Sequence, residues 1–97
     1  MNPPVVYSPT LSDLRGELPR FGVKNVWLFG SRARGDQHDD SDWDILVEFA
    51  GTPSFDDFMG LKLFLEDCLG RPVDVLSLAA CKPRFLAAIK DELQHVA

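Results

Sequence analysis

The chain has few basic residues for its acidic content. Its 97 residues include ten Lys and Arg against 15 Asp and Glu, which gives a net charge of −5. A protein that binds the phosphate backbone of duplex DNA presents a basic face, so we expect no direct nucleic-acid binding. A solvated acidic surface keeps a protein soluble, and this accounts for most of the acidic side chains.

Cysteines are scarce and long apolar runs are absent. Cys68 and Cys81 lack metal-type spacing and a nearby histidine pair, so they are predicted to be small buried hydrophobic residues. No run approaches the ~18 apolar residues of a membrane span, and MNPPVVYSPT has neither the basic nor the apolar region of a signal peptide. We therefore expect a cytoplasmic protein without a membrane contact.

The length predicts one domain over residues 1–97, in which 1–9, with three prolines, forms an extended arm. Leu11, Leu14 and Leu18 recur at helical spacing, ahead of Pro19 and Gly22, which limit that helix. The rest of the pattern predicts three strands, at 26–29, 44–49 and 72–78. It also predicts a helix from the cap Ser54 to Gly70. A last helix is predicted after Pro83, with Phe85, Ile89, Leu93 and Val96 in register. This order indicates a small α/β or α+β domain on a three- or four-stranded sheet.

Five aspartates fall within residues 36–44, directly before an apolar strand. Asp42 and Asp44 are two residues apart, so their side chains share one face of a strand with Cβ atoms ~7 Å apart. Carboxylates this close repel one another unless a cation lies between them, and Mg²⁺ binds through one or two carboxylates plus substrate phosphates. The alternative is a solvated loop in which the acids cap turns.

Two neighbouring features bear on that choice. Gly30 and Ser31 end the preceding apolar run, where a sharp turn leaves room for a phosphate, and Arg32 and Arg34 can add charge-assisted contacts. The alternative for this segment is an ordinary strand-to-helix turn.

Asp74 is the second feature, because it is flanked by valines inside a predicted strand, where an unpaired carboxylate is costly. It would complete a metal site or accept the proton of an attacking hydroxyl; alternatively, it faces water on an edge strand. A phosphate-binding turn together with three acidic side chains is typical of enzymes that catalyse nucleotidyl transfer.

Residues 28–49, LFGSRARGDQHDDSDWDILVEF, resemble the signature of the minimal nucleotidyltransferases, a branch of the DNA polymerase β superfamily. That family shows G-S-x-A-R-G, a short acidic loop, S-D-x-D with a hydrophobic strand, and a downstream "VD" strand. The chain matches this signature at Gly30, Ser31, Ala33, Arg34, Gly35, Ser41, Asp42, Asp44, Val73 and Asp74.

The resemblance implies a small nucleotidyltransferase fold with a mixed sheet. It also implies that the Gly30-Ser31 turn, with Arg32 and Arg34, binds the triphosphate of ATP. Asp42, Asp44 and Asp74 would then hold Mg²⁺ and act as the catalytic carboxylates. Members of the family commonly pair with a HEPN-domain RNase toxin, and antitoxin members transfer AMP from ATP to a tyrosine of that toxin. A hetero-oligomer with such a toxin is therefore expected.

Three functions remain open from the sequence. The intact acid set favours an active adenylyltransferase antitoxin. The small size and spare apolar residues, Leu63 and Phe64 among them, would suit an antitoxin that neutralises by binding alone. A catalytic fragment of a larger nucleotidyltransferase is the third, against which the complete-looking terminal helix argues. The sequence also leaves open whether Trp43, between the two aspartates, faces the core or the nucleotide base.

Overall fold

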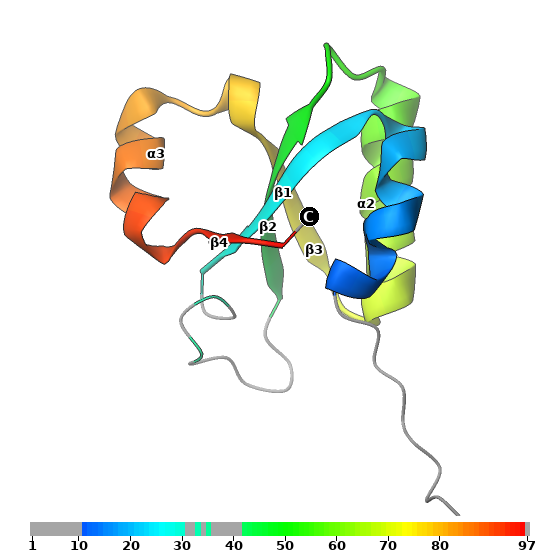
Figure 1. Ribbon diagram of the computed structural model, residues 1–97, viewed down its shortest axis with the longest axis horizontal. Coiled ribbons are helices and arrows are strands. Elements are labelled where there is room, and N and C mark those ends of the chain that lie inside the picture. The colour runs from blue at the N-terminus through cyan, green and yellow to red at the C-terminus, as the bar shows by residue number, and fades with distance from the viewer. Residues whose placement is uncertain (1–10, 31–32, 34, 36–41, 97) are drawn as a thin grey trace, which may run out of the picture.

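The computed structural model describes residues 11–30, 33, 35 and 42–96 of the chain (Figure 1). The predicted arm at 1–9 lies outside these residues, as does most of the polar segment between the first two strands. No helix within the described residues is long and apolar enough to cross a membrane.

The described part of the chain is built on one mixed sheet of four strands in the order β3-β2-β1-β4. The strands are β1 (Val23–Phe29), β2 (Trp43–Phe49), β3 (Val73–Ser77) and β4 (Gln94–His95). β1 pairs antiparallel with β2 and with β4, whereas β2 and β3 are parallel. The predicted α/β class with a three- to four-stranded mixed sheet is therefore confirmed.

Helix α2 (Phe55–Leu69) makes the crossover that joins the parallel strands β2 and β3. It begins where the sequence predicts, because the Ser54 hydroxyl accepts a 3.0 Å hydrogen bond from the Asp57 N–H. It ends at Gly70, whose φ of 69° is left-handed and suits glycine. Local sequence thus determines both ends of this helix.

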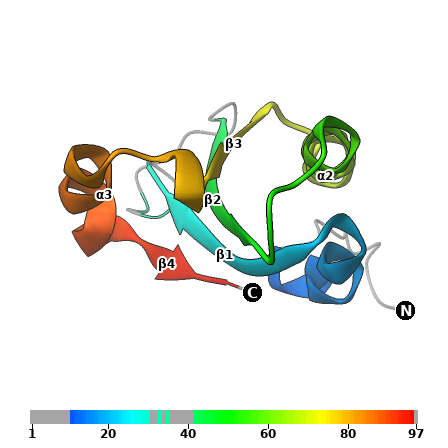
Figure 2. The ribbon, with the colours of Figure 1, turned by 90° about the horizontal axis from the view of Figure 1, so that it is seen from above.

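The helices cover both faces of the sheet. Figure 2 shows α2 and the 3₁₀-helix η1 (Leu11–Phe21) on one face and α3 (Pro83–Ile89) on the other. The face toward α2 and η1 carries the larger apolar cluster, with Val26, Leu28, Ile45, Val47, Val73 and Val75 from the sheet. The face toward α3 carries Phe29 and Leu46 against Ile89. This alternation along each strand is the period-two pattern of a sheet covered on both sides.

The last predicted helix is wrong beyond Ile89. After α3 the chain makes a 3₁₀ turn, η3 (Lys90–Glu92), and then becomes extended and pairs with β1 as β4. Leu93 packs in the cluster on the α3 face, but Val96 packs in the cluster on the opposite face. The predicted helix stripe is therefore divided: Phe85 and Ile89 belong to α3, whereas Leu93 and Val96 flank the edge strand β4, which covers the open side of β1.

The spare apolar residues of α2 divide between core and surface. Phe64 lies against Phe21 of η1, with ring centroids 5.5 Å apart, so it is used inside the fold. Leu63 is 58% exposed and Phe55 is 78% exposed. Cys68 and Cys81 are free, and each packs at the margin of one apolar cluster, but both are partly buried rather than buried as the sequence predicts.

Candidate active site

Three neighbouring strands bring predicted site residues together at one end of the sheet. Asp44 of β2 pairs in register with Phe29, the last residue of β1, so Gly30 lies beside it. On its other side Asp44 pairs in register with Asp74 of the parallel strand β3. Register partners in a sheet point to the same face, ~5 Å apart. The two carboxylates therefore lie side by side, on the face that carries Leu46 and α3.

Gly30 and Asp44 are in close contact. A Cβ built on Gly30 would overlap the Asp44 carboxylate, and Gly30 has a φ of 77°, which side-chain-bearing residues rarely adopt. The Gly30 carbonyl also accepts a 3.1 Å hydrogen bond from the Ala33 N–H, which closes a turn directly after β1. Only glycine fits at this position.

Asp42 directly precedes β2 and contacts Arg71. Its Oδ1 lies 3.8 Å from a terminal nitrogen of Arg71, and its side chain is 55% exposed. An exposed ion pair of this kind contributes little stability. In residues 11–30, 33, 35 and 42–96, no cluster of three or more His, Cys, Asp or Glu side chains is arranged to hold a metal ion.

A cavity of about 480 Å³ adjoins the two paired aspartates. Its wall includes Asp44 and Asp74, and the remaining lining residues come from the sheet, α2 and α3: Phe29, Phe58, Met59, Lys62, Val75, Leu76 and Phe85. A larger cavity of about 740 Å³ lies at the opposite end of β2 and β3 and contains neither aspartate. The smaller cavity places two carboxylates of the predicted site beside an apolar wall, an arrangement that is typical of a binding site.

Other predicted site residues fall outside the described part of the chain. Ser31, Arg32 and Arg34 belong to this group. Trp43 is described and settles the question left open by the sequence, because it packs with the cluster between the sheet and α2. Its side chain therefore lies on the core face, opposite to Asp44.

Sequence reasoning missed Glu92. The Gly30 N–H donates a 3.0 Å hydrogen bond to Oε1 of Glu92, 62 residues further along the chain. Glu92 ends the 3₁₀ turn η3, just before β4. Nothing in the local sequence predicts this contact. The predicted helix continues through Glu92 and gives no reason to expect it beside Gly30.

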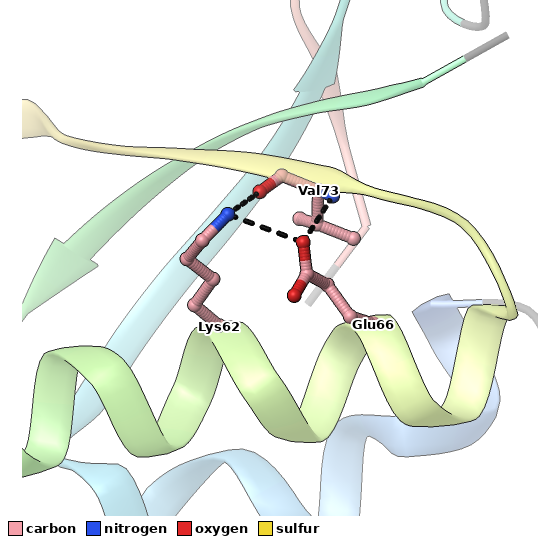
Figure 3. A network of polar contacts seen from close by, with 3 residues as sticks. All are labelled: Lys62, Glu66 and Val73. Carbon is pink, nitrogen blue, oxygen red and sulfur yellow. Dashed lines mark hydrogen bonds and ion pairs between the residues drawn. The ribbon is translucent and has the colours of Figure 1, made fainter.

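Two side chains of α2 hold the free edge of β3 next to Asp74 (Figure 3). Lys62 Nζ donates to the Val73 carbonyl at 2.7 Å, and the Val73 N–H donates to Glu66 Oε2 at 3.0 Å. Lys62 Nζ also lies 3.2 Å from the same Glu66 oxygen. Both backbone groups of Val73 are thereby bound by α2, which fixes the strand that carries Asp74.

These contacts predict a pH dependence of stability. The Val73 N–H, followed by the Lys62 ammonium, lowers the pKa of Glu66 below its ordinary value of 4.5, against a smaller opposing effect of desolvation. The unfolded chain then binds more protons than the folded one just below pH 4.5. The stabilisation from Glu66 is complete above that pH and is lost as the pH falls through the lower, folded pKa.

Chemical denaturation of the wild type and Glu66→Gln between pH 3 and 6 measures this effect. The difference between their free energies of unfolding should shrink as the pH falls below about 4.5. Lys62→Met should retain most of the pH dependence, because the Val73 N–H is the leading cause. A difference that stays constant over this range would contradict the assignment.

Known nucleotidyltransferases are similar to this chain in sequence and fold. Residues 17–96 match the family described as polymerase beta, nucleotidyltransferase. Over 77 residues the chain is 39% identical to the protein adenylyltransferase MntA of Thermococcus cleftensis, covering 79% of this chain and 78% of that relative.

Two solved structures are similar in fold and sequence. A candidate minimal nucleotidyltransferase superposes with a TM-score of 0.74 at 37% identity, covering 84% of this chain and 83% of the other. The toxin–antitoxin MntA-HpeT, in a Y104A mutant, superposes with a TM-score of 0.68 at 27% identity, covering 87% of this chain and 65% of the other.

Proposed function

Because the chain belongs to the polymerase beta nucleotidyltransferase family, we propose that it transfers AMP from ATP to a tyrosine hydroxyl of a HEPN-domain toxin. It acts as the antitoxin of that partner and forms a hetero-oligomer with it. One observation carries the proposal: Asp44 and Asp74 are register partners on adjacent strands, beside a turn at Gly30 that tolerates only glycine.

Asp42, Asp44 and Asp74 are the proposed metal-binding and catalytic acids. Mg²⁺ needs only one or two protein carboxylates, since substrate phosphates and water complete its octahedron. The Asp44–Asp74 pair fits this requirement without a preformed cluster of three acids. When bound, Mg²⁺ would neutralise charge on the phosphates and orient them.

The transfer itself forms one bond and breaks another. The acceptor oxygen attacks the α-phosphorus of ATP, the bond from that phosphorus to the α,β-bridging oxygen breaks, and pyrophosphate leaves. Asp74 is exposed on the edge strand β3, so an acceptor can reach it from solvent. We assign it the proton of the attacking hydroxyl. The turn at Gly30, with Ser31, Arg32 and Arg34, is the proposed site of the triphosphate.

Two further observations support a protein acceptor. The Thermococcus relative is named a protein adenylyltransferase, and the similar MntA-HpeT structure is a toxin–antitoxin complex. The acidic charge of −5 argues against a nucleic-acid substrate. The free thiols of Cys68 and Cys81 fit a reducing compartment, so we place the reaction in the cytoplasm.

Neutralisation by binding alone is the second candidate. It is favoured by Phe55 and Leu63, two large apolar side chains that α2 exposes. Such residues suit a partner interface, and an interface alone would block a toxin without any chemistry.

Labelled ATP separates these two functions. The chain is incubated with Mg²⁺, the product of its neighbouring gene, and ATP labelled either at the α- or at the γ-phosphate. Adenylyl transfer places the α label on the partner and leaves the γ label in pyrophosphate. A stable complex that acquires neither label would support neutralisation by binding, and acquisition of the γ label would indicate a phosphoryl transferase instead.

A further inference from the structure

Both backbone groups of Gly30 are engaged in the fold. Its carbonyl accepts the Ala33 N–H at 3.1 Å, and its N–H donates to Glu92 Oε1 at 3.0 Å. The first contact closes the turn, and the second fixes the peptide plane from which the turn starts. A hydrogen bond to a carboxylate is stronger than one between neutral groups. The Glu92 carboxylate therefore restrains the orientation of the Gly30 peptide.

The segment that carries Glu92 is itself held against the sheet. Ile89 is buried with Phe29 and Leu46, and the ring of Phe85 packs edge-on against that of Phe29 at 6.0 Å between centroids. After Glu92 the chain pairs with β1, with Gln94 opposite Leu28. Packing before Glu92 and strand pairing after it leave the carboxylate little freedom, so its position beside Gly30 is set by the fold.

The contact extends the β1–β4 pairing past the N-terminal end of β4. Along β1, Val26 accepts the Val96 N–H through its carbonyl at 2.9 Å, and Trp27 and Leu28 pair with β4. At Gly30 the partner is no longer backbone but the Glu92 side chain. The C-terminal segment is thus joined to the second half of β1, from Val26 to Leu28, and then to Gly30 in the turn beside Asp44.

We propose that Glu92 is a positioning residue for nucleotide binding, which fixes the Gly30 peptide beside Asp44 before the ATP phosphates bind. This inference rests on the proposed function. It also assigns the Gly30 N–H a role in the fold, through Glu92, rather than in binding phosphate. Preformed geometry of this kind lowers the cost of binding.

Glu92→Ala and Glu92→Gln test the role when compared with Glu48→Ala. Glu48 is the matched control, because its Oε1 accepts a 2.7 Å hydrogen bond from Asn25 on β1, away from Gly30. We expect Glu92→Ala to raise the KM for ATP on the order of tenfold, with a smaller change in kcat. Glu92→Gln keeps an oxygen that can accept the Gly30 N–H and should restore KM to within about twofold. Glu48→Ala should leave KM unchanged.

A second measurement does not depend on activity. In ¹H–¹⁵N spectra the Gly30 amide should resonate downfield and exchange slowly in the wild type and in Glu92→Gln, and lose both properties in Glu92→Ala. The inference is overturned if Glu92→Ala keeps the wild-type KM, if Glu92→Gln is as defective as Glu92→Ala, or if the Gly30 amide is the same in all three proteins.

Failure of the proposed function is distinguishable from failure of this inference. A wild type that binds ATP but transfers no AMP contradicts the function alone, and the Kd for ATP of the two Glu92 variants, by calorimetry, then decides the role of Glu92. Tighter ATP binding by Glu92→Ala would overturn the inference, since the carboxylate would then compete with phosphate. A wild type that binds no ATP overturns both.

Discussion

Replacing Asp42 and Asp44 together by asparagine is expected to abolish AMP transfer without unfolding the protein. If these acids hold the metal, their loss removes several kcal/mol of stabilisation of the developing charge. Each ~1.4 kcal/mol is a factor of ten in rate, so the rate should fall at least ~1,000-fold. The labelled-ATP reaction measures this fall, and thermal melting reports on the fold.

The stability of this variant should not decrease. Asp44 lies next to Asp74 in the sheet, and like charges this close repel one another when no cation is bound. The ion pair of Asp42 with Arg71 is exposed at 3.8 Å and contributes little. An unchanged or higher Tm together with lost transfer would therefore separate a functional role from a structural one.

Asp56→Asn/Asp57→Asn is the matched control. It makes the same change in charge on two exposed aspartates in the first turn of α2, away from the sheet. Loss of their interaction with the helix dipole costs ~0.3–1 kcal/mol per residue, and transfer should continue at the wild-type rate. Equal transfer by both double variants would refute the proposed role of Asp42 and Asp44.

Gly30→Ala is expected to have the second large effect, on stability and activity together. Alanine at a φ of 77° costs ~1–2 kcal/mol, and its Cβ would overlap the Asp44 carboxylate. Relief of that overlap displaces either Asp44 or the turn, at a further cost of ~1–3 kcal/mol. Because both are parts of the proposed site, AMP transfer should be lost even in the fraction that remains folded.

Gly22→Ala isolates the backbone contribution. Gly22 has nearly the same φ, 76°, but a Cβ there would meet no atom within 4 Å. Its Tm should fall only by the amount due to φ, and Gly30→Ala should melt at least ~5 °C lower still, because ~1 kcal/mol shifts the Tm of a domain this size by ~4–8 °C. Equal Tm values for the two variants would show that the contact of Gly30 with Asp44 is not tight.

How well the sequence predicts the secondary structure differs from one element of this protein to the next. Ser54 and Gly70 mark both ends of α2, because capping depends on groups only a few residues away. The same local reasoning fails after Ile89. Leu93 and Val96 have spacing that fits a helix, yet the open edge of β1 pairs with this segment as a strand. Tertiary pairing overrides a local pattern there.

The sequence by itself determined which residues are the candidates for the chemistry. It singled out Gly30, Asp42, Asp44 and Asp74 and predicted that a strand would carry each of the last two. These conclusions depend on residue type and on spacing within one segment, which short-range sterics and charge control.

Only the tertiary structure decided which of these groups meet, and what supports them. Register places Asp44 beside Asp74 rather than beside another residue of β3. Chain closure brings Glu92 to the Gly30 N–H across 62 residues. Such contacts form because an edge strand and a partly buried N–H each need a partner, and the identity of that partner follows from how the whole chain packs.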